Sequence, residues 1–169
     1  MAIEHKLFLD LEETIITNWS ESVLVNAGAI KEWIDQMFET DRVEVRMFSF
    51  AIWNDLDKLH FEMSGMKAMI ERALDVVIVE WLSVDEMRKI VEEWSGIQYF
   101  DTTDFVSMNG KHGCFEKVCL ARETNAECTL IDDVVPDRSI IDRTRNLEIH
   151  FVPVQHLTNQ ELLPVQRVL

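Results

Sequence analysis

Three apolar segments of this sequence are each followed directly by side chains that carry oxygen. Asp10 follows the first segment in LFLDLEETII, Ser49 follows the second in RMFSF, and Asp132 and Asp133 follow the third in CTLIDD. A carboxylate can attack phosphorus when a divalent cation shields the repulsion between the two anions. Hydroxyl and ammonium groups can hold phosphoryl oxygens, and further carboxylates are the ligands that Mg²⁺ prefers. The pattern predicts phosphoryl-transfer chemistry if the fold brings these residues together.

Strands and helices that alternate along the chain are expected to position these residues. Strand-like segments occur at residues 6–9, 43–50, 76–82, 97–100, 128–131 and 147–152. Helical spacing or capping signals predict helices at residues 27–39, 56–73, 84–95, 113–124 and 137–145. This alternation predicts an α/β domain with a mainly parallel sheet. Ligands bind such sheets at the carboxyl ends of the strands, where the oxygen-bearing residues are expected.

Composition restricts the class of protein. A chain of 169 residues with 47% hydrophobic residues suits a single globular domain. The net charge of −15 disfavours binding to extended nucleic acid, although a bound cation can still recruit a phosphorylated ligand. The three cysteines lack CxxC spacing, which predicts reduced thiols. No signal peptide and no apolar segment long enough to span a membrane is visible, so we expect a cytoplasmic protein with no membrane association.

The order of these motifs resembles that of the haloacid dehalogenase (HAD) superfamily, whose members are mostly magnesium-dependent phosphatases. The family's first motif is an apolar strand followed by Asp-x-Asp-x-Thr/Val, and LFLDLEETII places Asp10 and Thr14 at its first Asp and its Thr. Ser49 matches the second motif, and CTLIDDVVPD matches the fourth. The resemblance covers roughly residues 4–152. It implies a three-layer, Rossmann-like core with a mainly parallel sheet.

The resemblance further implies one domain over residues 1–169, with residues 153–169 as a C-terminal extension. Family members often carry a cap domain between core elements. Here the segment after Thr14 is too short for one, and the segment between Ser49 and Lys117 is occupied by core elements. A capless member has an open site. The expected partners are a phosphorylated substrate of unknown class and a protein partner or second copy of the chain.

The resemblance assigns a catalytic role to four residues. Asp10 would be the nucleophile that forms an aspartyl-phosphate, and Glu12 the general acid and base. Ser49 and a lysine would hold the phosphoryl group. Lys117 is favoured because it lies 15 residues before Asp132, and Lys111 in MNGKHG is the alternative.

The resemblance also implies Mg²⁺ as the cofactor. Its ligands would be Asp10, the backbone carbonyl of Glu12, and Asp133, with Asp132 binding through water or orienting the lysine. These assignments predict a magnesium-dependent phosphohydrolase.

Two residues depart from the family pattern. Glu12 stands where the family has its second Asp, so its carboxylate lies roughly 1.5 Å further from the backbone. Glu13 stands at the usual Gly. These changes leave a second hypothesis, a catalytically weakened HAD-like binding or regulatory protein. A receiver-like domain is disfavoured, because its acidic pair should follow the first strand and its phosphorylated Asp the third.

Overall fold

A computed structural model describes residues 3–39 and 42–162, and within these residues the chain forms an α/β fold around a six-stranded sheet. The strands are β1 (Glu4–Leu9), β2 (Val43–Met47), β3 (Val76–Trp81), β4 (Ala126–Asp132), β5 (Arg138–Asp142) and β6 (Leu147–Pro153). Their order across the sheet is β3-β2-β1-β4-β6-β5. All neighbouring strands are parallel except the edge strand β5, which is antiparallel to β6. The prediction of a mainly parallel sheet is confirmed.

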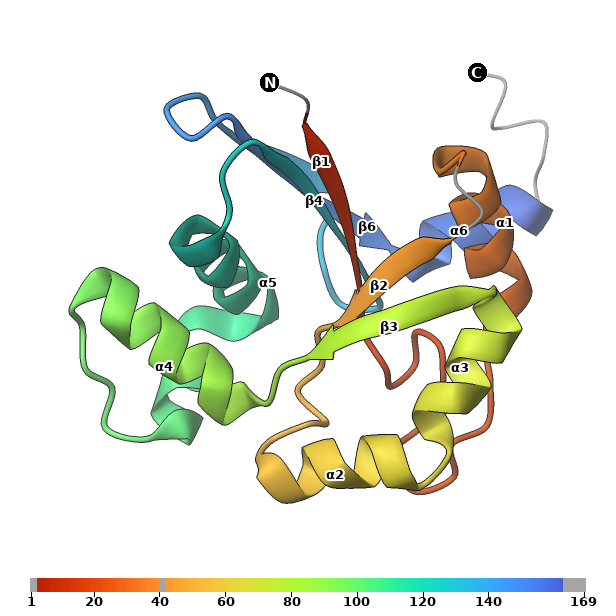
Figure 1. Ribbon diagram of the computed structural model, residues 1–169, viewed down its shortest axis with the longest axis horizontal. Helices are drawn as coiled ribbons and strands as arrows, with labels where there is room; N and C mark the ends of the chain where they lie inside the picture. Colours follow the sequence, from red (N-terminus) through yellow and green to blue (C-terminus); the bar gives the residue numbers. More distant parts are fainter. Residues whose placement is uncertain (1–2, 40–41, 163–169) are drawn as a thin grey trace.

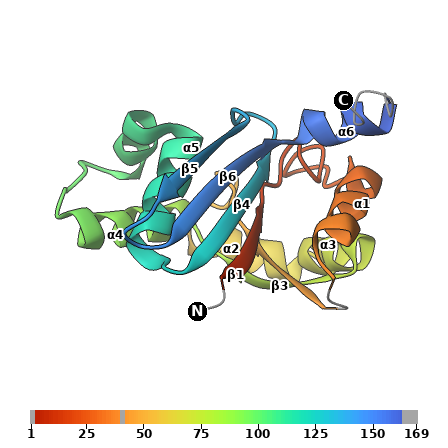
Figure 2. The ribbon, with the colours of Figure 1, turned by 90° about the horizontal axis from the view of Figure 1, so that it is seen from above.

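Helices cover the sheet on both faces, which gives three layers compatible with a Rossmann-like fold (Figures 1 and 2). They are α1 (Ala27–Met37), α2 (Asp55–Met63), α3 (Met66–Leu74), α4 (Val84–Ser95), α5 (Thr102–Arg122) and α6 (Val154–Leu162). One core lies between the sheet and α1, α2, α3 and α6, and the other lies between the sheet and α4 and α5. None of these helices has the combination of length and apolar character that crossing a membrane would require.

The central strand β1 is buried on both faces because it contributes side chains to both cores. Leu7 and Leu9 belong to the core on the side of α1, and Phe8 belongs to the core on the side of α5. A strand covered on both faces is expected to be continuously apolar, as residues 7–9, LFL, are. The Ser83 cap predicted for the helix after β3 is also present, because the side chains of Ser83 and Glu86 each accept the other's backbone N–H.

Several predicted elements differ from the structure. The helix predicted over 56–73 is two helices, because Gly65 adopts a left-handed φ of 91° between α2 and α3. Residues 97–100 form no strand. The helix predicted at 113–124 begins earlier, at Thr102, and includes a kink at Gly110 with φ 69°.

The helix predicted at 137–145 is wrong, since residues Arg138–Asp142 form strand β5. This segment pairs with β6 in an antiparallel ladder from Arg138↔Phe151 to Asp142↔Leu147. Ile140 packs partly against the core on the side of α5. A short segment with one apolar face can form either a helix or a strand, and the adjacent unpaired edge of β6 decides for the strand.

The predicted C-terminal extension contains α6, which packs Val154 and Leu157 into the core beside α1. Residues 163–169 of that extension lie outside the described residues. The order of the sheet places β1 between β2 and β4, so the direction in which the chain adds strands reverses at β1. In open parallel sheets, ligands bind in the crevice at the carboxyl ends of the strands that flank such a reversal.

Candidate active site

The carboxyl ends of β1, β2 and β4 lie level with one another, so the residues that follow them meet in one place. The Asp10 N–H donates to the Ile131 carbonyl oxygen at 3.0 Å, just before the Asp132–Asp133 pair. The Phe48 N–H donates to the Leu9 carbonyl oxygen at 2.9 Å, just before Ser49. Parallel pairing in this register therefore brings the three predicted strand-end motifs together.

Asp10 is the centre of a buried polar cluster. The residue is 4% exposed, and its Oδ1 accepts a hydrogen bond of 2.7 Å from Lys111 Nζ. Its Oδ2 accepts a hydrogen bond of 3.0 Å from the Thr14 hydroxyl. The ammonium group of Lys111 also lies 3.2 Å from Asp132 Oδ2. Lys111 thus lies between two buried carboxylates and balances only one of the two negative charges.

The two acids after β4 extend this cluster into a potential cation site. Asp10, Asp132 and Asp133 each offer a carboxylate oxygen, and the three oxygens lie within 4.8 Å of one another. Asp132 Oδ1 accepts the backbone N–H groups of Asp133 and Val134. Asp132 Oδ2 is fully buried and no described residue donates it a well-aligned hydrogen bond, since Lys111 approaches it outside hydrogen-bond geometry. Closely spaced oxygens with unused capacity are what Mg²⁺ requires.

Burial determines the electrostatics of the cluster. It raises the pKa of Asp10, and the nearby Lys111 offsets only part of that effect. Burial likewise raises the pKa of Asp132 and that of the less enclosed Asp133. Burial by itself would lower the pKa of Lys111, but Asp10 and Asp132 outweigh it and raise that pKa. The cluster is therefore short of positive charge, and a bound cation would favour the ionised carboxylates.

We expect the free energy of unfolding of the metal-free protein to fall as the pH rises, because these acids become ionised in a buried site. Asp10 and Asp132 bind protons more tightly when folded, so their contribution is complete below their ordinary pKa of 3.8 and is lost as the pH rises through the raised values. In that window each acid lowers the free energy of unfolding by up to about 1.4 kcal/mol per pH unit.

Denaturant unfolding of the wild type and of Asp132→Asn, both in chelator, measures this effect. The asparagine keeps an oxygen for the two backbone N–H groups, so the comparison isolates the charge. The stability gain of the variant over the wild type should grow as the pH rises above about 4. A gain that is constant or shrinks with pH contradicts the raised pKa.

Ser49 is buried beside the cluster, with 1% of its surface exposed. Its oxygen accepts the Ala51 N–H at 3.1 Å, which leaves the hydroxyl hydrogen able to donate to a ligand. Ser49 lines a hollow of about 400 Å³ that opens above the strand ends. The other lining residues are Asp10, Glu12, Glu13, Thr17, Asn18, Phe50, Ala51, Lys111, Asp133 and Val134. The hollow therefore joins the predicted nucleophile, the Ser49 hydroxyl, the alternative lysine Lys111 and the predicted metal ligand Asp133, while Asp132 is not among its lining residues.

Glu12 lines the same hollow, but its carboxylate is engaged by the loop that follows. Glu12 Oε2 accepts the Trp19 backbone N–H at 2.8 Å. Glu13 adopts a φ of 61°, the left-handed region that glycine enters without strain and that costs other residues about 1 kcal/mol. The turn after Asp10 therefore keeps a glycine-like backbone although glycine is absent.

The structure brings Lys111 to the cluster instead of the favoured Lys117. The Lys117 ammonium group donates to Asn109 Oδ1, and neither Asp10 nor Asp132 is its partner. The kink at Gly110 starts a new helical segment directly at Lys111, beside the strand ends. Lys117 lies six residues further along, roughly 9 Å down the helix axis. Sequence spacing did not identify Lys111 as the lysine of the cluster, because the helix was expected to begin only at residue 113. Gly110 was the residue that could have indicated a new helical segment starting at Lys111.

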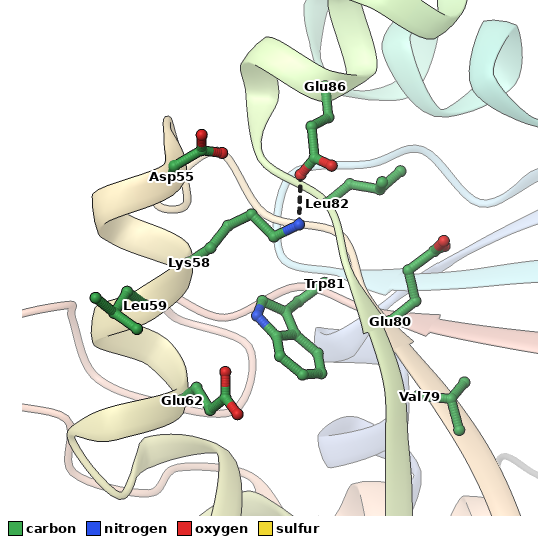
Figure 3. A pocket seen from close by; sticks show the side chains of 9 residues that line it. All are labelled: Asp55, Lys58, Leu59, Glu62, Val79, Glu80, Trp81, Leu82 and Glu86. Carbon is green, nitrogen blue, oxygen red and sulfur yellow. Dashed lines mark hydrogen bonds and ion pairs between the residues drawn. The ribbon is translucent and has the colours of Figure 1, made fainter.

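A larger hollow of about 510 Å³ lies elsewhere, between α2 and the edge strand β3 (Figure 3). Lys58 is the only lysine among its described lining residues. Figure 3 shows the Lys58 ammonium group directed at Glu86, and the two side chains lie 2.6 Å apart. The remaining charged lining residues are the acids Asp55, Glu62 and Glu80. This hollow contains no uncommitted cation, among its described lining residues, to hold a phosphoryl group. The chemistry of the strand-end motifs belongs to the smaller hollow.

No protein-family model, no curated protein and no solved structure matches the chain.

Proposed function

We propose that the protein is a magnesium-dependent phosphohydrolase of the HAD type, with Asp10 as the nucleophile. The observation that carries this proposal is the buried Asp10 at the carboxyl end of the central strand, where Lys111 bridges it to Asp132 and where Asp133 also converges. The sheet order and the position of each motif after its strand support the same proposal.

The residues that line the hollow have different roles in a two-step reaction. A carboxylate oxygen of Asp10 attacks phosphorus and forms an aspartyl-phosphate, while the bond to the leaving oxygen breaks and Glu12 supplies its proton. Glu12 then takes a proton from water as the water attacks the same phosphorus. Inorganic phosphate leaves and the Asp10 carboxylate is restored. Lys111 and Ser49 hold the phosphoryl oxygens and stabilise the charge that develops on them.

The donor set fits Mg²⁺, because three carboxylates converge and one buried oxygen of Asp132 lacks a good donor. Asp10, Asp132 and Asp133 would hold the ion, with the Glu12 carbonyl as a further oxygen. A bound Mg²⁺ supplies positive charge that allows a phosphate anion to approach the Asp10 carboxylate.

The hollow favours a bulky phosphate ester as the substrate. The described chain between Ser49 and Lys111 consists of α2, α3, β3, α4 and the first segment of α5, all of which pack on the sheet. No further domain closes over the hollow among these residues, so a large leaving group can extend into solvent. A generic aryl phosphate tests the chemistry, with hydrolysis expected in Mg²⁺ and lost in chelator. Equal rates in Mg²⁺ and chelator contradict the proposal.

A weakened binding or regulatory protein is the second candidate, and the contact between Glu12 and the Trp19 N–H favours it. Glu12→Asp distinguishes the two. If Glu12 is the fitted general acid, shortening it by about one methylene should lower the turnover rate by roughly 100-fold. If the natural site is weakened, phosphatase activity should appear only in Glu12→Asp. Glu13→Asp makes the same change at the neighbouring acid, and its rate should stay close to that of the wild type.

A further inference from the structure

A cluster of histidine and glutamate side chains lies on an open part of the sheet, away from the hollow. Cys128 of β4 and Ile149 of β6 point into the core beside α5. Their neighbours Glu127, Glu148 and His150 therefore point to the other face. Figure 1 shows the beginnings of β1 and β4 projecting beyond α1, α2, α3 and α6, the helices that cover the rest of that face. Parallel sheets are normally covered on both faces, so this polar cluster occupies an unusual position.

The side chains of the cluster have the spacing of metal ligands. His150 Nε2 lies 3.3 Å from Glu127 Oε1 and 3.9 Å from Glu148 Oε1. One ligand atom from each of the three residues falls within 4.8 Å of the other two. Around a tetrahedral zinc ion with bonds of about 2.0–2.2 Å, ligand atoms lie roughly 3.3–3.6 Å apart. Only small side-chain adjustments are needed for one ion to contact all three.

The pairing of the strands makes a cation favourable at this point. Glu127 and Glu148 are direct partners in the β4–β6 ladder, and like charges that face each other across strands are destabilising. The Glu127 side chain is 26% exposed and that of His150 is 25% exposed, so water screens them only in part. A cation between the two carboxylates would remove this repulsion.

Two further residues orient the cluster. Ser139 Oγ on β5 lies 2.6 Å from His150 Nδ1, a contact that fixes the imidazole ring with Nε2 directed at the acids. His5 Nδ1 on β1 lies 3.2 Å from the second oxygen of Glu127. Metal-binding histidines commonly have such a partner on the ring nitrogen that does not bind the ion.

We infer that Glu127, Glu148 and His150 form a second cation site, for a divalent transition metal such as Zn²⁺. The imidazole nitrogen selects such a metal over Mg²⁺, which prefers oxygen ligands alone. Asp132 lies five positions beyond Glu127 along β4, roughly 17 Å away, so this site is independent of the active site. A bound ion would join β4 to β6 on the face opposite to α5, and it should raise the melting temperature.

Calorimetric titration with ZnCl₂ in excess MgCl₂ tests this site, because excess Mg²⁺ should fill the carboxylate cluster at Asp10 under the function proposed above. The wild type should bind one equivalent of Zn²⁺, and His150→Gln and Glu148→Gln should each bind it on the order of 100-fold more weakly. His156→Gln is the matched control, because Asp137, at 3.2 Å, is the one acid that pairs with His156 among the described side chains. Asp10→Asn should bind Zn²⁺ as the wild type does, whatever its effect on phosphate ester hydrolysis.

The His150 imidazole ¹⁵N resonances give a second measurement that does not depend on affinity. Saturating Zn²⁺ should shift Nε2, which faces the acids, far more than Nδ1. Unchanged Zn²⁺ affinity in both His150→Gln and Glu148→Gln would overturn the inference, since the ion would then bind elsewhere. The absence of Zn²⁺ binding by the wild type in excess Mg²⁺ would also overturn it.

Discussion

Asp10→Asn is expected to abolish phosphate ester hydrolysis while it raises the stability of the metal-free protein. An amide oxygen is a poor nucleophile toward phosphorus, and the loss of a nucleophile costs on the order of 10⁴-fold or more in turnover rate. The oxygen of the introduced amide can still accept a hydrogen bond from the Thr14 hydroxyl or from the Lys111 ammonium group, the two donors that contact Asp10 in the wild type. The change therefore removes reactivity with little change in shape.

The gain in stability follows from the charge balance of the cluster. Burial raises the pKa of Asp10 despite the nearby Lys111, so the ionised form is disfavoured in the folded state. Asparagine removes that cost at neutral pH and leaves Lys111 paired with Asp132. Each kcal/mol gained raises the melting temperature of a chain of this size by roughly 2–4 °C. The same substitution should reduce the stabilisation that Mg²⁺ gives, because it removes one of the three carboxylates.

Three measurements on Asp10→Asn test both expectations together. They are the rate on an aryl phosphate, the melting temperature in chelator, and the transfer of labelled phosphate from ester to protein. The wild type should carry a hydroxylamine-sensitive label on the peptide that contains Asp10, and the variant should carry none. Asp35→Asn is the control, because it makes the same change on an exposed part of α1, where Asp35 pairs with Lys31. A variant that hydrolyses the ester at the rate of the wild type contradicts the assignment of Asp10.

The core of the fold is predictable from the sequence because its strongest local signals agree with its packing. VVIVEWL and KLFL are mostly apolar, with Glu80 and Lys6 as their only charged residues, and both form strands of the parallel sheet. The Ser83 and Glu86 pair predicts the beginning of α4, since capping depends on residues that are near one another in the chain.

Elements whose conformation depends on distant partners were not predictable in the same way. Residues 138–142 become a strand because β6 offers them an edge, and that edge exists only after β4 and β6 have paired. The break at Gly65 interrupts apolar helical spacing that continues on both sides of it. Periodicity alone therefore predicted one helix where the chain forms two.

In the candidate site, too, some features follow from the local sequence and others depend on the path of distant segments. Asp10 directly follows β1, Ser49 lies two residues beyond the end of β2, and the Asp132–Asp133 pair lies at the end of β4. The parallel register of these strands therefore brings the three motifs together. The lysine comes from a helix whose direction changes at Gly110, and spacing along the chain does not encode that direction. The contact between Glu12 and Trp19 depends on the path of a loop, which sequence motifs do not specify.

Lys111→Met should cause the largest loss of stability among single substitutions in the cluster. The Lys111 side chain is 11% exposed and contacts two buried carboxylates at 2.7 Å and 3.2 Å. Removal of one partner from a buried ion pair typically costs about 3–5 kcal/mol, because the remaining charge loses its compensation. Methionine keeps most of the length and the apolar contacts of the lysine stem, so the loss of stability measures the contribution of the positive charge. The turnover rate should also fall by roughly 10²–10³-fold, as expected when a group that stabilises transition-state charge is removed.

Lys117→Met is the matched control, since it makes the same change on the same helix at the ammonium group that donates to Asn109. We expect its stability and rate to stay close to those of the wild type. The cost of Lys111→Met should shrink at lower pH, where Asp10 and Asp132 take up protons and need no compensation. Mg²⁺ should also recover part of the lost stability by supplying positive charge to the same carboxylates. Denaturant unfolding with and without Mg²⁺ measures both effects, and a larger loss in Lys117→Met than in Lys111→Met contradicts the assignment of Lys111.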